Sequence, residues 1–261
     1  MKIKLFNLVA ITVVLLSQSV SADITLEDIY RDTIINDVTL SVPSDYADIG
    51  EALLFLDDKR IANDVTVTIQ VADGTYNNYP TIVLNHPYGS RIEIIGNTSS
   101  PGSVVLNFIG KHGIDADNGY SIGKIDGLTL VGDQTNYCNG INAYNNASVI
   151  LGNNMIVMNF YCGILSRSNA TVIASGITIQ SCSYGGINCG DSTVWVVDAL
   201  IENNAQWGLH SYRTGYIQAD NAIIRNNTTG AVLVQEISLV EAFGATISGT
   251  TSVDPKGALL Q

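Results

Sequence analysis

The fold is decided by residues 161–190, which read YCGILSRSNATVIASGITIQSCSYGGINCG. Within this stretch Gly163-Ile164 is followed 23 residues later by Gly186-Ile187. The same pairing of glycine with a small or aliphatic residue recurs at steps of 22 or 23 residues at Gly140-Ile141, Gly208-Leu209 and Gly230-Ala231, and at steps of 27 at Gly113-Ile114 and Gly257-Ala258. A fixed period of this length indicates one short structural unit stacked many times.

Each repeat carries two further apolar positions. The first holds Val149, Val172, Val194, Ile217 and Leu239, and the second, about seven residues on, holds Ile156, Ile179, Ile201 and Ile224. Large apolar residues alternate with others around these positions, which is the period of a strand with one buried face. Three short strands in 22 or 23 residues predict an all-β fold, a right-handed parallel β-helix of roughly seven or eight coils.

Stacking of equivalent residues predicts columns along the inside of the coil. The residue after each glycine should form an aliphatic column, and the residue two positions further on is small: Ala143, Ser166, Cys189 and Ser211. The pairs Asn203-Asn204 and Asn226-Asn227 follow the last strand of adjacent coils. Their amides are expected to hydrogen-bond one another and the turn backbone.

The first 22 residues have the pattern of a signal peptide. Lys2 and Lys4 precede an apolar run that is short for a membrane span, and Val20-Ser21-Ala22 is the small-residue pattern of a cleavage site. Cleavage after Ala22 would give a secreted or periplasmic chain that begins at Asp23 and has no membrane anchor. A retained N-terminal anchor is the alternative.

The mature chain is expected to form one domain. Residues 23–42 are assigned as an N-terminal lead segment, and residues 43–261 as a single β-helix domain. Apolar residues at helical spacing predict a helix at about residues 46–61: Ile49, Ala52, Leu53, Leu56 and Ile61. Because an open β-helix end exposes unpaired strands and apolar core, this helix is expected to cap the domain.

The charge balance narrows the classes of partner. The formal net charge is −12, and removal of residues 1–22, which hold two lysines and no acidic residue, takes it to −14. Such a chain lacks the basic surface that nucleic acids and anionic membranes require. The balance is compatible with a neutral glycan, or with an anionic one bridged by divalent cations, and equally with simple solubility.

The four cysteines leave several states open. Cys138 and Cys162 lie just before the glycines of adjacent coils, close enough for a disulfide, whereas Cys189 at an interior position is expected to be a buried thiol. The state of Cys182 and the pairing of all four are not fixed by the spacing. No CxxC pair occurs and the three histidines are scattered, so neither a metal nor another cofactor is expected.

One stretch resembles a known superfamily. Residues 46–54 followed by VTVTIQVADGTY at residues 65–76 resemble the helix and strand-turn opening of pectin-lyase-like right-handed parallel β-helix proteins. Later strands as far as Phe108 resemble β-helix segments of phage tail-fibre and tailspike-type proteins. The resemblance covers about residues 40–250 and implies the fold, while the motifs of the polygalacturonase-like, pectate-lyase-like and pectin-methylesterase-like branches are missing. Tailspike-like relatives are trimers, but no trimerisation segment follows Ile247, so a monomer or weak association is expected.

Aromatic and polar residues gather on one predicted wall of the coil. They lie two residues before the glycines, at Tyr161, Tyr184 and Gln206, two residues after them, at Asn142, Leu165, Asn188 and His210, and four after, at Tyr144, Arg167 and Tyr212. Flat rings beside amides suit sugars, which present flat C–H faces and hydroxyl edges. The binding candidates are therefore Tyr161, Tyr184, Asn188, His210, Tyr212 and Arg167. Alternatively, these residue types simply fit strand surfaces and turns.

Some carboxylates have spacings that suit glycoside hydrolysis or calcium binding. Glycoside hydrolysis needs two carboxyl groups about 5–9.5 Å apart. Asp198 and Asp220 lie on adjacent coils and are the candidates, whereas Glu202 is expected to form a surface ion pair with the residue one coil on, Arg225. Asp115, with Asp117 two residues later, could bind Ca²⁺ or lie in a solvated turn.

A lyase needs a base beside a cation, which His210 with Arg167 or Arg213 could supply. The function expected from the sequence is nevertheless recognition of an extracellular or cell-surface polysaccharide by a secreted β-helix, with no identifiable catalytic centre. The alternatives are a polysaccharide lyase or glycoside hydrolase of the same fold, and a structural or adhesive surface protein.

Overall fold

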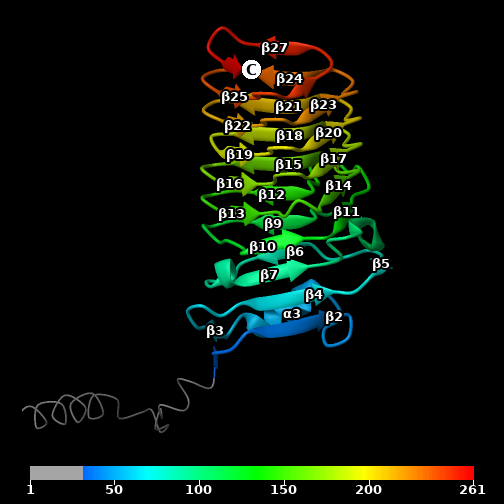
Figure 1. Ribbon diagram of the computed structural model, residues 1–261, viewed down its shortest axis with the longest axis vertical. Coiled ribbons are helices and arrows are strands. Elements are labelled where there is room, and N and C mark those ends of the chain that lie inside the picture. Colours follow the sequence, from blue (N-terminus) through cyan, green and yellow to red (C-terminus); the bar gives the residue numbers. More distant parts are fainter. Residues whose placement is uncertain (1–31) are drawn as a thin grey trace, which may run out of the picture. The chain divides into compact units, whose positions relative to one another are not determined.

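The structure is a computed structural model that describes residues 32–261. The expected signal peptide, its cleavage site after Ala22 and residues 23–31 of the expected lead segment lie outside the described residues. From residue 34 onward the chain winds into a parallel β-solenoid of about 10 turns (Figure 1). The expectation of roughly seven or eight coils was low, because the first turns have long loops that break the period on which the count rested.

Three long parallel sheets run along the solenoid. Sheet I contains β5 (Gly74–Tyr76), β8 (Val104–Asn107), β11 (Thr129–Val131), β14 (Ile156–Met158), β17 (Thr178–Gln180), β20 (Leu200–Glu202), β23 (Ile223–Arg225) and β26 (Thr246–Ile247). Sheet II contains β6 (Ile82–Leu84), β9 (Ile114–Ala116), β12 (Ile141–Ala143), β15 (Cys162–Arg167), β18 (Gly185–Gly190), β21 (Trp207–Tyr212), β24 (Gly230–Val234) and β27 (Thr251–Val253). Sheet III contains β13 (Ser148–Ile150), β16 (Thr171–Ile173), β19 (Thr193–Trp195), β22 (Tyr216–Gln218), β25 (Leu239–Glu241) and β28 (Ala258–Leu260).

The N-terminal turns use a separate sheet. It contains β2 (Val38–Val42), β4 (Val67–Val71), β7 (Ile92–Ile95) and β10 (Lys124–Asp126). Strands β1 (Thr33–Ile34) and β3 (Arg60–Ile61) form a two-stranded sheet, the 3₁₀ turn η1 (Gly89–Arg91) precedes β7, and the 3₁₀ turn η2 (Pro101–Ser103) contacts β8 and β11 of sheet I. Strand β2 pairs in parallel with β4. Part of the segment that the sequence assigned as a lead is therefore the first strand of this sheet.

Helix α3 spans Ile49–Leu56 and is shorter than the predicted residues 46–61. It begins at Asp48, whose side chain accepts a hydrogen bond from the Glu51 N–H at 2.9 Å, while Glu51 accepts the Ala47 N–H at 2.9 Å. This reciprocal pair satisfies N–H groups that the first helical turn leaves free. The expected apolar face is buried against β2, β4 and β6. Its role as a cap remains a prediction.

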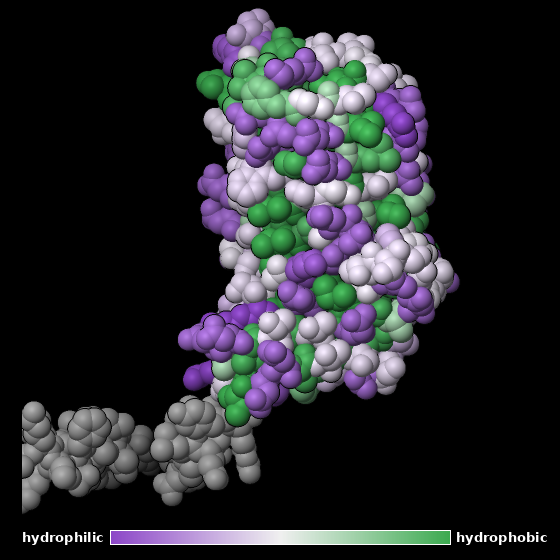
Figure 2. All heavy atoms as spheres, in the orientation of Figure 1, coloured by the Kyte–Doolittle hydropathy of each residue, from purple (hydrophilic) through white to green (hydrophobic). Residues whose placement is uncertain are grey.

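The predicted interior columns are confirmed. Ile141, Ile164, Ile187 and Leu209 pair in successive strands of sheet II and are completely buried. The small residues two positions on pair in the same way: Ala143, Ser166, Cys189 and Ser211. The outer surface is mixed, and Figure 2 shows apolar side chains distributed among polar ones. In residues 32–261 no helix has both the length and the apolar character needed to span a membrane.

At several positions the predicted register was wrong. The inward residue is one position later than the spacing suggested: Val157 rather than Ile156, Val232 rather than Ala231, and Val240 rather than Leu239. Gly257-Ala258 belongs to another sheet, since Ala258 pairs with Leu239 in sheet III. Side chains alternate between the faces of a strand, so a one-residue error exchanges core and surface. Where two apolar residues were adjacent, the sequence pattern did not distinguish them.

The predicted asparagine contacts are confirmed. The Asn204 side-chain amide donates to Asn227 Oδ1 at 2.9 Å, and the Asn227 amide donates to the Ile201 carbonyl at 3.2 Å. Asn204 Oδ1 in turn accepts the Cys182 N–H at 3.0 Å. These bonds satisfy buried polar groups at the turn that follows sheet I and tie three coils together.

Asn204→Ala is expected to lower the free energy of unfolding by about 1–3 kcal/mol, because it leaves the buried Cys182 N–H without a partner and removes one of the two hydrogen bonds that Asn227 Oδ1 accepts. Urea denaturation followed by circular dichroism measures the change. Asn85→Ala, at an exposed asparagine, is the control and should leave the midpoint unchanged. Equal midpoints for the two variants would show that the ladder does not stabilise the turns.

Candidate functional site

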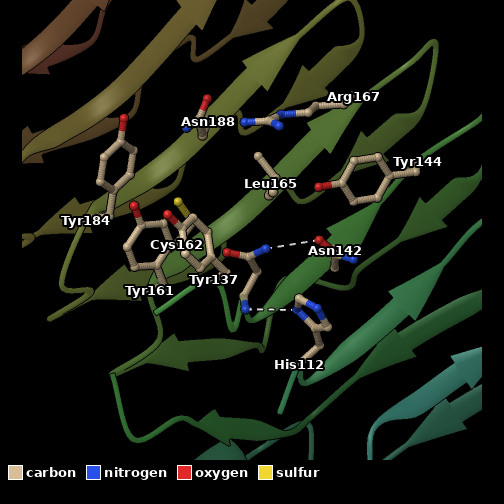
Figure 3. A pocket seen from close by; sticks show the side chains of 11 residues that line it. His112, Tyr137, Asn142, Tyr144, Tyr161, Cys162, Leu165, Arg167, Tyr184 and Asn188 are labelled. Atoms are coloured by element: carbon tan, nitrogen blue, oxygen red, sulfur yellow. Dashed lines mark hydrogen bonds between the residues drawn. The ribbon is translucent and has the colours of Figure 1, made fainter. Parts of the chain in front are cut away.

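A cleft of about 450 Å³ lies on sheet II, over β12, β15 and β18 (Figure 3). Residues from these strands line it, together with residues just before or after strands of sheet II, such as His112 before β9 and Tyr144 after β12. Because the strands are stacked in parallel, side chains at one repeat position form rows along the sheet. The cleft therefore takes its chemistry from several coils.

A row of tyrosines forms one side of the cleft. The rings of Tyr161 and Tyr184 are stacked, with centroids 4.8 Å apart and an angle of 17° between the planes. The ring of Tyr137 lies 5.3 Å from that of Tyr161 and is tilted by 41°. The Tyr184 N–H donates to the Tyr161 carbonyl at 2.8 Å, which places the two residues at equivalent points of adjacent coils. Tyr137 is the most open of the three, with 76% of its surface exposed.

Outward-facing residues of sheet II form the floor. Asn142, Leu165 and Asn188 pair directly with one another on β12, β15 and β18. Asn142 Oδ1 accepts a hydrogen bond from the Asn139 amide at 3.0 Å, and the Asn142 amide donates to Asp115 Oδ1 at 2.7 Å. The floor thus combines a hydrogen-bonded group, Asn139 with Asn142 and Asp115, with the side chains of Leu165 and Asn188.

Several polar atoms around the cleft have no hydrogen-bond partner within residues 32–261. They are Oδ1 of Asn139, Oδ1 of Asn188 and Nε of Arg167. Asn139 is 2% and Asn188 5% exposed, so water does not readily replace the missing partners. Buried polar groups are normally paired, and unpaired ones at a cleft suit a ligand that supplies the partner.

Arg167 is held by an aromatic ring from a strand further along the solenoid. Its guanidinium lies 5.6 Å from the ring centroid of Tyr212. Between them in the sheet is Gly190, which pairs with both residues. A side chain at this glycine would lie only 2.3 Å from the Tyr212 ring, so glycine is what allows the ring to lie across the strand.

His112 and Asn139 line the cleft, although the sequence analysis did not predict them as site residues. Both immediately precede repeat glycines, as Cys162 does, so the period that located the tyrosines could also have located them. The backbone N–H of Asn139 donates to His112 Nδ1 at 3.0 Å. A backbone N–H only donates, so the ring proton of neutral His112 lies on Nε2. Tyr137 was also missed, since it lies three rather than two residues before its glycine.

The structure brings four of the six predicted binding residues into the cleft lining: Tyr161, Tyr184, Asn188 and Arg167. Tyr212 contacts the site through Arg167. His210 lies on β21, beside the Tyr212 ring at 5.0 Å, and its Nε2 is 2.9 Å from Gln235 Oε1. Burial lowers the pKa of His210, which favours its neutral form.

The carboxylates considered for hydrolysis lie elsewhere. Asp198 and Asp220 occupy turns between sheets III and I, and the Asp198 N–H donates to the Asp220 carbonyl at 2.9 Å. The Asp220 carboxylate accepts bonds from the Phe243 N–H and the Gln218 amide. The two are adjacent, as expected, but they are on a different side of the coil from the cleft.

Two other predicted residues are in ion pairs. Arg213 Nη1 lies 3.1 Å from the Asp191 carboxylate, and the Arg213 guanidinium is 5.9 Å from the centroid of the Tyr212 ring. The expected surface pair of Glu202 with Arg225 is confirmed at 2.7 Å.

All four cysteines are free, so the disulfide that the spacing allowed between Cys138 and Cys162 is not formed. Cys162 lines the cleft, and burial raises the pKa of its thiol to about 12. Burial likewise raises the pKa of Cys182 to about 12 and that of Cys189 to about 11. At neutral pH these three are thiols rather than nucleophilic thiolates.

No group of three or more histidine, cysteine, aspartate or glutamate side chains is placed to hold a metal ion in the described part of the chain. Of the pair considered for calcium, Asp115 accepts a hydrogen bond from Asn142, and Asp117 accepts one from Asn145 at 2.7 Å. Both carboxylates therefore have protein partners.

Comparisons with protein-family models, with curated proteins and with solved structures find no match to this chain.

Proposed function

We infer that this protein is a secreted β-helix that binds an extracellular or cell-surface polysaccharide in the cleft on sheet II. The observation that carries the inference is the row of Tyr137, Tyr161 and Tyr184 beside unpartnered amide oxygens.

The cleft offers both kinds of contact that sugars make, with aromatic rings and with polar groups. Aromatic rings pack against the apolar C–H faces of a sugar, and polar groups bond its hydroxyls. Burial raises the pKa of the Tyr144 and Tyr161 hydroxyls, so both stay protonated at neutral pH and can donate hydrogen bonds. The unpartnered oxygens of Asn139 and Asn188 can accept hydrogen bonds from sugar hydroxyls.

The shape of the site suits a chain rather than a single compact molecule. The tyrosine row has one member on each of three successive coils, so it extends along the axis of the solenoid. Successive sugars of a polysaccharide would meet successive coils. A chain bound in this way gains from each coil a contact of modest strength.

A polysaccharide lyase is the second candidate, favoured by one observation. Arg167 lines the cleft and can supply the cation that β-elimination beside a carboxylate needs, whereas His112 can act as the base only when its Nδ1 is released from the Asn139 N–H. Release of unsaturated products, detected by ultraviolet absorbance, would identify this activity.

Tyr184→Ala is expected to weaken polysaccharide binding by roughly 10-fold, because the stacked ring supplies a flat contact face. Thermal stability should change little, since the ring is only partly buried. A glycan array identifies a bound polysaccharide, and isothermal titration with that glycan then compares the variants.

Trp195→Ala is the matched control. This aromatic residue is 38% exposed on sheet III, outside the cleft, and its loss should leave affinity unchanged. Wild-type affinity of both Tyr184→Ala and Tyr161→Ala would place the binding site elsewhere on the solenoid.

A further inference from the structure

Of the lysines and arginines in residues 32–261, only Arg167 lines the cleft. Within residues 32–261 it makes no salt bridge, and its buried Nε has no hydrogen-bond partner. By contrast, Arg213 and Arg225 pair with Asp191 and Glu202, and Arg91 donates to the Ile61 carbonyl and to Asn63. Although the chain has twice as many acidic as basic residues, no carboxylate of the described residues forms a salt bridge with this cleft arginine.

The guanidinium of Arg167 is positioned without being neutralised. The Tyr212 ring, lying across Gly190, contacts it at 5.6 Å and leaves its charge in place. Figure 3 shows the Arg167 side chain extending toward Asn188 over the floor of the cleft. A partly buried cation held in this way favours an anion that can reach it.

The nearby acceptors specify what accompanies the anion. Oδ1 of Asn188 and Oδ1 of Asn139 are buried and unpartnered, and each requires a donor such as a hydroxyl. An acidic sugar with free hydroxyls can supply the partners of Arg167 and Asn188, and a neighbouring sugar can supply that of Asn139, which lies two coils from Asn188. The ring face of the acidic sugar remains available for Tyr161.

The charge of the whole chain limits how acidic the glycan can be. One arginine serves the cleft, and the formal net charge of −12 repels a densely anionic polymer. This repulsion grows with every additional negative sugar, whereas the attraction to Arg167 is gained once. Isolated acidic sugars among neutral ones satisfy both conditions.

We propose that the cleft recognises a heteropolysaccharide in which single anionic sugars, carrying a carboxylate or a sulfate ester, are separated by neutral sugars. Arg167 binds the anionic group, the amide oxygens of Asn139 and Asn188 bind hydroxyls, and the tyrosine row binds neutral neighbours. The proposal rests on the proposed function and names the substrate class of the same site.

The test is a glycan array that contains neutral polysaccharides, polymers charged at every sugar, and polymers with isolated uronate or sulfated sugars. Wild-type protein should retain members of the last group. A bound glycan is then treated in two ways: carboxyl reduction removes the charge of a uronate, and desulfation removes a sulfate ester. The treatment that weakens binding identifies which of the two groups the cleft recognises. Removal of the recognised group should lower the affinity of the protein for the glycan roughly 10-fold to 100-fold.

Arg167→Gln should lower the affinity for the unmodified glycan by the same factor. Removing the acidic group from the glycan should then not weaken binding to this variant any further, because both changes remove the same interaction. Arg225→Gln makes the same change of charge on sheet I and should bind like wild type. Arg167→Lys should recover only part of the affinity, since it keeps the charge but not the planar fork. Melting temperatures of all variants establish that each is folded.

The outcomes separate this proposal from the function on which it rests. Equal binding of neutral glycans, preference for polymers charged at every sugar, or wild-type affinity of folded Arg167→Gln would overturn the proposal and leave polysaccharide binding intact. Retention of no glycan on the array would overturn both.

Discussion

Ile187→Asp is expected to prevent the solenoid from folding, or to leave it so unstable that it melts far below the wild type. Ile187 is completely buried between Ile164 and Leu209 in sheet II. The substitution removes an aliphatic side chain, at about 2–5 kcal/mol, and places an unpaired carboxyl group in an apolar core, at several kcal/mol more. Domains are stable by only about 5–15 kcal/mol, so one such change is comparable with the whole.

Soluble yield, circular dichroism and resistance to limited proteolysis measure the effect. The control is Ile223→Asp, at a strand residue that is 40% exposed on sheet I, and it should remain folded. Ile187→Val gives a measurable intermediate, with an expected loss of about 0.5–1.5 kcal/mol in urea denaturation. An Ile187→Asp protein that is soluble and melts with the wild type would contradict the buried column.

The sequence predicted the interior best where the repeats are of equal length. From Ile141 to Leu209 each coil keeps one inward aliphatic residue after its glycine, and the structure pairs them as expected. Beyond β21 two apolar residues, Ala231 and Val232, stand side by side, and Val232 pairs with Leu209. Spacing alone does not show which of the two residues faces the core. The larger side chain does so here, because it fills the interior better.

The cleft was predictable in part for the same reason. Tyr161 and Tyr184 stand at a fixed distance from repeat glycines, so their neighbourhood followed from the register. The position of Tyr212 did not follow, because its ring leans across Gly190 toward Arg167 on a strand further down the sheet. Side-chain direction depends on local space, which the repeat period does not encode.

The repeat glycines are explained by close approach rather than by unusual backbone angles. A Cβ atom added at Gly163 would lie 2.2 Å from Cγ2 of Ile179 and 2.7 Å from the carbonyl oxygen of Gly186. Ile179 is itself completely buried, so it has little room to move. The glycine therefore sets how closely sheets I and II meet at their shared corner.

Gly163→Ala is accordingly expected to lower the free energy of unfolding by about 1–3 kcal/mol or more, although alanine is otherwise a mild substitution. Gly102→Ala is the matched control, because a Cβ there meets no atom within 4 Å, and it should change stability by less than about 0.5 kcal/mol. Urea denaturation of both variants measures the difference.

A double variant identifies the cause of the loss. Ile179→Ala removes the methyl group nearest the new Cβ, so Gly163→Ala should cost less in its presence than in the wild-type background, although contact with the Gly186 carbonyl remains. Because Gly163 lies between β15 residues that face the cleft and the core, the single variant should also displace Tyr161 from Tyr184 and weaken binding. Additive losses in the double variant, or equal stability of Gly163→Ala and Gly102→Ala, would mean that the glycines recur for a reason other than packing at this corner.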